Sequence, residues 1–348
     1  MNTIEGWKMS RTQFNLSVEL EAFIQGIAKD SLKDKTVLIT GGAGFIGSWL
    51  AEALMALEAK VTVLDNLSTG SLKNIEHLMD LSNFKFLKGD VSNFKFEEEY
   101  DFLVHAANLP APDMYVKKPV ETMLSNSLGL LNVLEASRKH NSIVLYMSTS
   151  EVYGNAEVIP TPESYWGRVN PVGIRSCYDE SKRFGEALCM AYLKQYGVNV
   201  RIARLFNTYG PRLDPNASYA RVISKFIIQA LNNQSITVHG DGKQTRSFLY
   251  ISDAVNALIR MIIKESLKGE VINVGSPNEI TILKLAKLVK KFTNSKSNIE
   301  FHPPRPDDPR RRCPDISKAK SLLGWEPKTP LEDGLKFTIE WFKKVLQI

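Results

Sequence analysis

Short apolar runs alternate with segments of helical spacing through the first two thirds of the chain. The apolar runs are TVLITG (36–41), KVTVLDN (60–66), FKFLKGD (84–90), DFLVHAA (101–107), SIVLYMST (142–149) and VRIARLFN (200–207). Strands that are buried on both faces of a parallel sheet have this continuous apolar character. Helices are expected at FIGSWLAEALMALE (45–58) and near 119–139 and 179–196. The alternation predicts a doubly wound α/β fold.

Beyond about residue 208 the elements become shorter and more mixed. The sequence predicts helices at YARVISKFIIQALNN (219–233), from Ser252, at ILKLAKLVKKF (282–292) and from Leu331, with strands at ITVHG (236–240), VINVG (271–275) and IEFHP (299–303). These elements are typical of a smaller α+β lobe placed over the sheet. We therefore divide the chain into an N-terminal extension (1–33), a Rossmann domain (34–207) and a C-terminal lobe (208–348).

The N-terminal extension contains one amphipathic segment, LSVELEAFIQGIAK (16–29). Its apolar residues Leu16, Leu20, Phe23, Ile24 and Ile27 follow helical spacing. We expect an added helix that packs either on the body of the protein or on a partner subunit.

Composition excludes several classes of protein. Of the 348 residues, 43% are hydrophobic and 24% charged, which is typical of soluble globular proteins, and no apolar stretch is long enough for a membrane span. A secretory signal is not recognisable, so a cytoplasmic location is expected. The net charge of +6 is spread along the chain without a nucleic-acid module, so no nucleic-acid partner is expected. The odd number of cysteines, without CxxC spacing, argues against disulfides and against a metal site.

Three glycines directly follow the first predicted strand and begin the first predicted helix. In TGGAGFIG these are Gly41, Gly44 and Gly47, with Phe45 and Ile46 between the last two. The first glycine permits a tight turn, the second lets a pyrophosphate approach the backbone, and the third lets the helix lie close to the sheet. The N–H groups at the start of the helix favour an anion. We predict a dinucleotide site here.

Acidic residues end the next two strands. Asp65 can accept hydrogen bonds from both hydroxyls of an adenosine ribose, and no arginine follows it to hold a 2′-phosphate, which favours NAD over NADP. A turn-capping role is the second interpretation of Asp65. Asp90 could meet the adenine, although turn capping explains it nearly as well. The further candidate cofactor residues, at or next to strand ends, are Asn66, Val91, Ala106 and Ala107.

Tyr178 and Lys182 are candidates for proton transfer. They are four residues apart on a predicted helix and so project from one face. The pKa of a free phenol is about 10, too high for a base at neutral pH, but a neighbouring ammonium and a nicotinamide cation would lower it. The pair alone occurs by chance in many helices. Together with the glycine loop and with STSEVYG (148–154) at the end of a strand, the catalytic interpretation is favoured.

The glycine spacing and the YDESK segment (178–182) resemble the extended short-chain dehydrogenase/reductase family over roughly residues 35–345. In this family the strand-end hydroxyl, here Thr149, bonds the reacting sugar oxygen and acts with Tyr178 and Lys182. The next two residues differ between subfamilies. An aspartate in place of Ser150 is typical of dTDP-glucose 4,6-dehydratases, where it expels water. The Thr149, Ser150, Glu151 triplet resembles that of UDP-glucuronate decarboxylases, so Ser150 and Glu151 are expected at the sugar.

Further stretches resemble the same decarboxylases: YWGRVNPVGIRSCYDESKR (165–183), RLFNTYGPR (204–212), GDGKQTRSFLYISD (240–253) and DDPRRRCPDISKAKSLLGWEP (307–327). The resemblance implies NAD as cofactor, a UDP-sugar bound mainly by residues 208–348, and substrate contacts from Asn207, Arg212, Arg246 and Arg312. Arg175 is another candidate for binding the carboxylate of the sugar. The alternative interpretation is that Arg175 is simply exposed at the surface. Taken alone, Arg310–Arg312 would instead be a solvated loop. The loop NLPAPDMYV (108–116) departs from the family pattern near the sugar.

The resemblance implies decarboxylation of UDP-glucuronate to UDP-xylose, with oxidation and re-reduction at C4. The alternatives are a UDP-sugar 4-epimerase, a decarboxylase that releases the 4-keto pentose, and a NAD-binding regulatory protein without catalysis. The family also implies a homodimer in which the helices near 119–139 and 179–196 pair across the interface. Their apolar stripes would be explained equally well by packing in the core.

Overall fold

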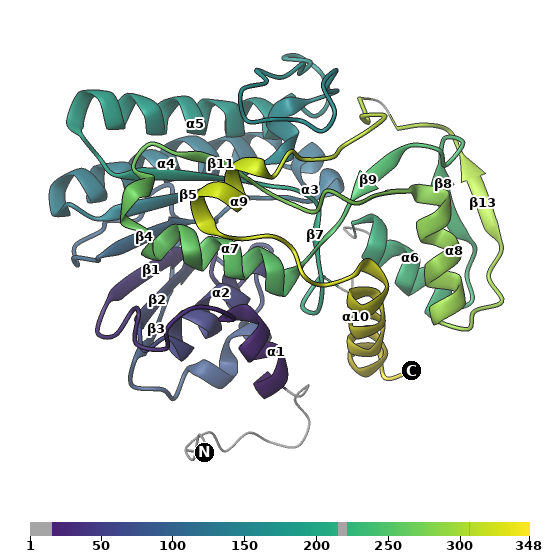
Figure 1. Cartoon of the computed structure of the whole chain (residues 1–348), viewed down its shortest axis with the longest axis horizontal. Coiled ribbons are helices and arrows are strands. Elements are labelled where there is room, and N and C mark those ends of the chain that lie inside the picture. The colour runs from purple at the N-terminus through teal and green to yellow at the C-terminus, as the bar shows by residue number, and fades with distance from the viewer. Residues whose placement is uncertain (1–15, 215–220, 306) are drawn as a thin grey trace.

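A seven-stranded parallel sheet runs through the larger part of the molecule (Figure 1). The computed structural model describes residues 16–214, 221–305 and 307–348. In spatial order the strands are β11 (Val271–Val274), β6 (Val200–Leu205), β5 (Ile143–Thr149), β4 (Phe102–His105), β1 (Thr36–Thr40), β2 (Lys60–Asp65) and β3 (Phe84–Lys88). Each neighbouring pair is parallel. The predicted doubly wound α/β fold is confirmed.

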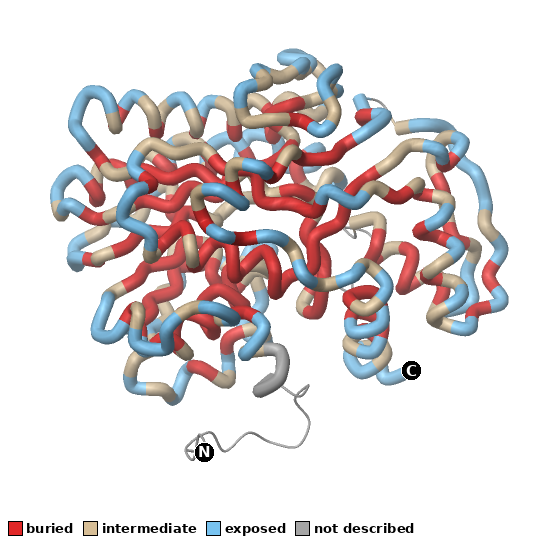
Figure 2. Tube along the Cα trace, in the orientation of Figure 1, coloured by how far each residue is buried: buried red, intermediate tan, exposed pale blue. Residues whose placement is uncertain are grey.

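Helices cover both faces of this sheet, and the buried residues lie between them and the strands (Figure 2). On one face, α4 (Pro119–His140) and α5 (Ser176–Tyr196) form an apolar core with residues such as Leu103 and Tyr146. On the other face, α2 (Phe45–Ala56) and α7 (Ile251–Ile263) pack with residues such as Val37 and Ile39. Alternate residues of a strand point to opposite faces, which is why β1 contributes to both cores.

A smaller lobe lies beside the sheet at the ends of its strands. It contains α6 (Val222–Leu231), α8 (Ile282–Phe292), α10 (Leu331–Leu346), the parallel pair β8 (Ile236–His239) and β13 (Ile299–His302), and the antiparallel pair β9 (Thr245–Ser247) and β12 (Glu279–Thr281). The other elements are α3 (Pro112–Lys117), α9 (Ser317–Leu323), the parallel pair β7 (Thr208–Tyr209) and β10 (Leu249–Tyr250), and the 3₁₀ turns η1 (Leu72–Asn74), η2 (Glu76–Leu78), η3 (Ser150–Tyr153) and η5 (Glu265–Leu267).

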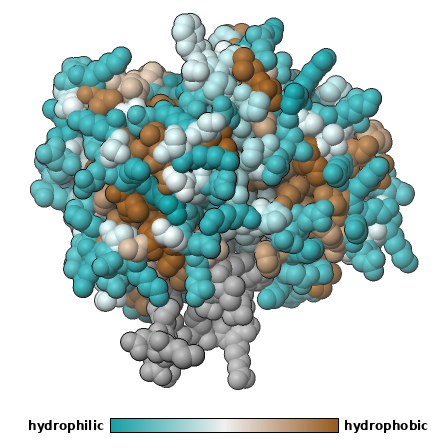
Figure 3. Space-filling model, in the orientation of Figure 1, coloured by the Kyte–Doolittle hydropathy of each residue, from teal (hydrophilic) through white to brown (hydrophobic). Residues whose placement is uncertain are grey.

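The surface is mixed in hydropathy, and the three thiols lie in the interior. Hydrophilic residues cover much of the face seen in Figure 3, with hydrophobic residues gathered in patches between them. None of the described helices is both long and apolar enough to cross a membrane. Cys177, Cys189 and Cys313 are free and buried.

One strand lies in a different layer from the one we expected. The segment VINVG, assigned above to the smaller lobe, forms β11 and extends the large sheet next to β6. Its residues Ile272 and Val274 are fully buried. In the chain, α7 follows β10 and contacts β5 and β6, which leads the chain back to this sheet before β11. The division at residue 208 stays a prediction, and the chain beyond it contributes to both layers.

The N-terminal helix α1 (Leu16–Phe23) packs on the body of its own chain. The Phe23 ring stacks on Trp49 of α2 with 4.9 Å between ring centroids, and Asn256 of α7 donates a hydrogen bond to the Phe23 carbonyl over 2.9 Å. Of the two packing partners expected, the structure therefore shows the body of the protein. Residues 1–15 of the extension and the first two residues of the segment 219–233 lie outside the described residues.

Candidate active site

A cavity of about 1280 Å³ lies at the carboxyl ends of the sheet strands, between the sheet and the smaller lobe. Strand order reverses between β1 and β4, and doubly wound sheets bind ligands in the crevice at such a point. Every predicted site residue except Lys182 lines this one cavity: Gly41, Gly44, Phe45, Ile46, Gly47, Asp65, Asn66, Asp90, Val91, Ala106, Ala107, Thr149, Ser150, Glu151, Arg175, Tyr178, Asn207, Arg212, Arg246 and Arg312.

The glycine turn brings backbone atoms closer together than side chains would allow. Gly41 has a φ of +71°, and a Cβ atom added to it would lie 2.7 Å from the Cα of Ala107. A Cβ at Gly47 would lie 2.5 Å from the Gly41 carbonyl oxygen. Gly44 is the N-cap of α2, and its lack of a side chain leaves the helix start without a side-chain cap. The turn therefore fits a pyrophosphate held by backbone N–H groups.

Asp65 and Asp90 both bind backbone N–H groups. Asp65 accepts from the N–H groups of Ala43 (3.0 Å) and Leu67 (2.7 Å), and burial raises the pKa of its carboxyl group. Asp90 accepts from the Ser92 N–H (2.9 Å) and from the Asn66 amide (2.8 Å). The turn-capping interpretation is thus correct for both residues. A carboxylate oxygen with one such bond keeps a lone pair, so capping does not prevent Asp65 from also binding a ribose.

Tyr178 lies buried at the sugar end of the cavity. Its hydroxyl lies near the Thr149 side chain, and its ring stacks on Tyr115 of α3 with 5.1 Å between centroids. Burial, reinforced by the negative charge of Glu151, raises the pKa of Tyr178 to about 12. The lowered phenol pKa that we expected from the neighbouring ammonium is therefore not a property of the chain alone, and it would need positive charge from a bound molecule.

Lys182 lies behind the cavity rather than on its wall. Its ammonium donates a hydrogen bond to the Met147 carbonyl over 2.8 Å and lies 4.9 Å from the centre of the Tyr146 ring. Only 1% of the residue is exposed, and burial lowers the pKa of its ammonium to about 7. Of the predicted pair, the structure thus brings Tyr178 to the cavity and leaves Lys182 against the end of β5.

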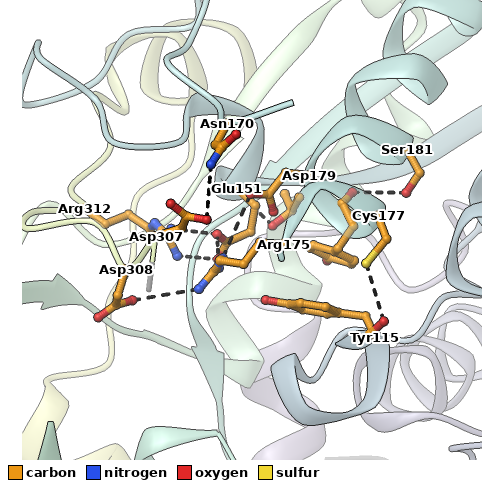
Figure 4. Close-up of polar contacts among 12 residues, drawn as sticks. Tyr115, Glu151, Asn170, Arg175, Cys177, Asp179, Ser181, Asp307, Asp308 and Arg312 are labelled. Atoms are coloured by element: carbon orange, nitrogen blue, oxygen red, sulfur yellow. Dashed lines mark hydrogen bonds and ion pairs between the residues drawn. The ribbon is translucent and has the colours of Figure 1, made fainter. Parts of the chain in front are cut away.

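Three arginines and three acids meet at the sugar end, and Figure 4 labels all of them except Arg246. We call these six residues the arginine cluster: Arg175, Arg246, Arg312, Glu151, Asp179 and Asp308. Glu151 of η3 is bound by both Arg312 and Arg175, with 2.7 Å and 2.5 Å between the bonded nitrogens and Oε2. Arg246 donates to Asp308 over 2.8 Å. The sixth member is Asp179, whose Oδ2 lies 3.9 Å from the Nε of Arg175.

The arginines of the cluster keep the buried Glu151 ionised. Burial by itself would raise the pKa of the Glu151 carboxyl group, but the charges of Arg312 and Arg175 lower it to about 2. The sugar end therefore carries a fixed negative charge on Glu151, held between two cations at the side of the cavity.

The predicted arginines end in different environments. The exposure considered for Arg175 is wrong, because its side chain is only 13% exposed and binds Glu151. Of the three consecutive arginines, Arg312 enters the cavity, Arg311 pairs with Glu279 and Arg310 is exposed, so the solvated-loop interpretation fails for Arg312. Arg212 donates to Glu52 over 2.6 Å and lies over the Trp49 ring, while still lining the cavity.

Sequence reasoning missed four residues at this end: Tyr115, Asp179, Arg221 and Asp308. Tyr115 comes from the loop that departs from the family pattern, and Arg221 lines the cavity with its Nη1 donating to the Thr208 carbonyl over 3.3 Å. Asp179 and Asp308 adjoin residues that were singled out, but sequence patterns did not show that they face the same arginines. Asn207, which was predicted, donates its amide hydrogen to the Ser247 carbonyl over 3.2 Å.

Comparison with known proteins places the chain among enzymes that act on nucleotide sugars. A family model described as GDP-mannose 4,6 dehydratase matches residues 38–338. The chain belongs to the NAD-dependent epimerase/dehydratase family. The resemblance inferred from the glycine turn and the YDESK segment is thereby confirmed.

Within this family, several curated relatives with nearly half of their residues identical are named as decarboxylases. UDP-glucuronic acid decarboxylase 1 of Danio rerio is 48% identical over 90% of this chain and 74% of the relative. UDP-glucuronic acid decarboxylase 3 of Arabidopsis thaliana is 46% identical over 90% of each. Among solved structures, the UDP-glucuronic acid 4-epimerase of Bacillus cereus, in complex with UDP-glucuronic acid and NAD, matches 89% of this chain and 99% of its own, with 30% identity and a TM-score of 0.81.

Proposed function

We propose that the protein converts UDP-glucuronate to UDP-xylose and carbon dioxide with NAD as its cofactor. The observation that carries the proposal is the arginine cluster, which lies beside Tyr178 and Thr149 in the cavity that also contains the glycine turn. An anionic sugar needs such cations, whereas a neutral hexose does not. Ser150 adds to the argument because it leaves no acid in the place from which dehydratases expel water. The relatives named as UDP-glucuronic acid decarboxylases support the same substrate.

The residues of the nucleotide end fit NAD. Gly41, Gly44 and Gly47 would hold the pyrophosphate against the start of α2, and Asp65 would accept from the ribose hydroxyls. An ionised Asp65 would repel a 2′-phosphate, which favours NAD over NADP. When bound, NAD supplies a reversible two-electron oxidant for C4 of the sugar.

Tyr178 and Thr149 would act on the C4 hydroxyl of the sugar. Both side chains line the cavity, so a sugar oxygen between their hydroxyls meets one group that holds it and one that takes its proton. A ketone at C4 lies β to the C6 carboxylate. The electrons of the C5–C6 bond can then move toward the C4 oxygen as carbon dioxide leaves, and protonation at C5 followed by reduction at C4 completes the pentose.

The arginine cluster would hold the C6 carboxylate during these steps. Arg175, Arg246 and Arg312 are all on the cavity wall and supply forked donors that suit a carboxylate. Because its pKa is about 2, Glu151 is ionised at neutral pH. It therefore serves to orient the arginines, the substrate or a water rather than to donate a proton of its own.

Incubation of the full chain with NAD and UDP-glucuronate tests the proposal. We expect release of one carbon dioxide per sugar, a UDP-pentose with the xylose configuration by NMR, and no net NADH. A product of unchanged mass with inverted C4 would contradict decarboxylation and identify a 4-epimerase, the alternative supported by the similarity to the Bacillus cereus enzyme. Stoichiometric NADH with a 4-keto pentose would show release of the intermediate. Failure of NAD to be reduced at any stage would favour a regulatory protein without catalysis.

A homodimer is part of the same proposal. On α4 the side chains of Val120, Met123, Leu124 and Leu128 are exposed, and on α5 that of Phe184. Apolar residues gathered on two neighbouring helices are typical of a surface covered by a second copy. Light scattering on the full chain should give twice the mass of 39.1 kDa, and the single mass would contradict the dimer. The cytoplasmic location stays a prediction.

A further inference from the structure

Asp179 is a buried carboxylate that is not fully paired. It lies on the first turn of α5 next to Tyr178, only 6% exposed and outside the cavity wall. Its Oδ2 lies 3.9 Å from the Nε of Arg175, and its Oδ1 has no hydrogen-bond partner among the described residues. Ionised carboxylates buried in this way are costly unless they are hydrogen-bonded. The structure thus leaves Asp179 poorly stabilised as an anion.

The groups around Asp179 come from every element packed against it. Glu151 lies on η3, Arg175 and Glu180 on or before the same helix, Arg312 in the loop before α9, Tyr115 on α3, and Cys177 and Tyr178 on α5. Burial raises the pKa of Tyr115, Cys177 and Tyr178, so these three groups stay neutral near pH 7. The charge that matters at neutral pH is therefore carried by the carboxylates and guanidinium groups.

The arginine cluster is balanced when all its members are ionised. Arg175, Arg246 and Arg312 then face Glu151, Asp179 and Asp308. An arriving sugar carboxylate would add a fourth negative charge to a neutral cluster. Burial and the charge of Glu151 raise the pKa of Asp179 to about 7, whereas the pKa of Glu151 is about 2. Of these two carboxyl groups, only Asp179 can change its charge near neutral pH.

We propose that Asp179 is a positioning residue that takes up a proton from solvent as the carboxylate of the substrate enters the arginine cluster, so that one negative charge replaces another. Protonation frees Arg175 from a nearby anion without breaking its bond to Glu151. The proposal rests on UDP-glucuronate being the substrate. It makes Asp179 a determinant of specificity for acidic sugars, acting through Arg175 rather than by touching the substrate.

Proton uptake on binding provides a direct test. The full chain carrying Tyr178→Phe is saturated with NAD, to prevent turnover, and is titrated by calorimetry in buffers with different ionisation enthalpies. UDP-glucuronate should bind with uptake approaching one proton near pH 8, because Asp179 is then mostly ionised before binding. Its Kd should rise about twentyfold between pH 6.5 and 8.5. UDP-glucose, which lacks the carboxylate, should show neither effect.

Two further substitutions in the same background separate this role from a structural one. Asp179→Asn keeps the shape without the charge, and should bind UDP-glucuronate without proton uptake and with nearly constant Kd across the pH range. Glu180→Gln is the matched control, because Glu180 is the neighbouring acid and pairs with Arg183; it should keep the pH dependence.

The outcomes separate the two proposals. If Asp179→Asn retains the proton uptake, or if UDP-glucose shows the same uptake, the role given to Asp179 is overturned while the proposed reaction stands. If UDP-glucuronate fails to bind at any pH, both fall. Should Asp179→Asn fail to fold, the difference in proton uptake between UDP-glucuronate and UDP-glucose in the Asp179-containing chain still decides, and equal uptake would refute the inference.

Discussion

The two ends of the cavity are built by different means. At the nucleotide end, the glycine turn and the start of α2 present backbone atoms, and Gly41, Gly44 and Gly47 lie within one short stretch of the chain. At the sugar end, side chains from η3, α5, β9 and the loop before α9 meet, although they are separated by up to 161 residues. The nucleotide end depends on the absence of side chains from the glycine turn. The sugar end depends on ion pairs between residues that are far apart in the sequence.

The same contrast appears in the electrostatics. Asp65 is buried without a cation from the described part of the chain, and its two backbone hydrogen bonds do not prevent burial from raising its pKa. Glu151 is buried between two arginines, which lower its pKa to about 2. A carboxylate at the nucleotide end thus destabilises the fold when ionised, whereas the one at the sugar end stabilises it. Opposite pKa shifts on two buried acids show that the partners, rather than burial alone, decide the charge.

The largest effect is expected where the two ends meet. Tyr178→Phe removes the hydroxyl that would take the proton of the C4 hydroxyl and should reduce turnover of UDP-glucuronate by about a thousandfold. Binding of both ligands should be retained, because the glycine turn and the charges of the arginine cluster are unchanged. Product formation and ligand titrations measure the two properties. Tyr192→Phe, on the same helix but outside the cavity, is the control and should retain activity; full activity of Tyr178→Phe would refute the role given to the phenol.

Gly41→Ala should damage the nucleotide end alone. The new Cβ would lie 2.7 Å from the Cα of Ala107 in a backbone with φ of +71°, so the turn must move. We expect NAD binding to weaken by on the order of a hundredfold, while UDP-glucuronate binding in the absence of NAD changes little. Fluorescence titration measures each affinity.

Gly324→Ala is the matched control for this prediction. Gly324 also has a positive φ, +58°, but a Cβ there would meet no atom within 4 Å. It should cost about 1 kcal/mol of unfolding free energy and leave NAD affinity unchanged. Equal loss of NAD affinity in both variants would show that backbone strain, rather than the close approach, explains the effect.

Arg312→Lys should damage the sugar end alone. Lysine cannot reproduce the two hydrogen bonds that the Arg312 fork makes with Glu151. UDP-glucuronate affinity should fall by about tenfold to thirtyfold, with UDP-glucose and NAD affinities nearly unchanged. Arg311→Lys, at the exposed neighbour that pairs with Glu279, should leave all three affinities intact. A similar loss for UDP-glucose would mean that Arg312 holds the diphosphate instead of the carboxylate.

The last comparison concerns the pH dependence of stability. The folded pKa of Glu151 is lowered, so its stabilising charge is present above about pH 4.5 and lost as pH falls toward 2. Glu151→Gln should cost up to about 3 kcal/mol at neutral pH and progressively less below pH 4.5. The folded pKa of Asp65 is raised, so ionisation costs stability, and Asp65→Asn should become relatively more stable as pH rises. Denaturant unfolding at several pH values measures both trends. If the unfolding free energies of Glu151→Gln and Asp65→Asn, each relative to the unsubstituted protein, changed with pH in the same direction, the contrast between the two acids would be wrong.

The sequence predicted the nucleotide end almost completely, because its physics is local. The glycine spacing identified the turn, and all the candidate cofactor residues except Lys182 line the cavity. The sheet strands were predicted from their apolar runs for the same reason. The strand β11 was placed in the wrong layer, because four apolar residues show that a strand is buried and do not show which sheet it joins.

At the sugar end the sequence predicted which residues matter without showing how they interact. Glu151, Arg175, Arg246 and Arg312 were named from motifs and resemblance, and all of them line the cavity. That Arg312 and Arg175 share Glu151, that Asp179 lies unpaired behind them, and that Tyr115 stacks on Tyr178 were decided only by the tertiary structure. Glycine turns and apolar periods act over a few residues and can be recognised in the sequence. Charge pairing acts through space, and only the folded chain determines which of its distant charges are neighbours.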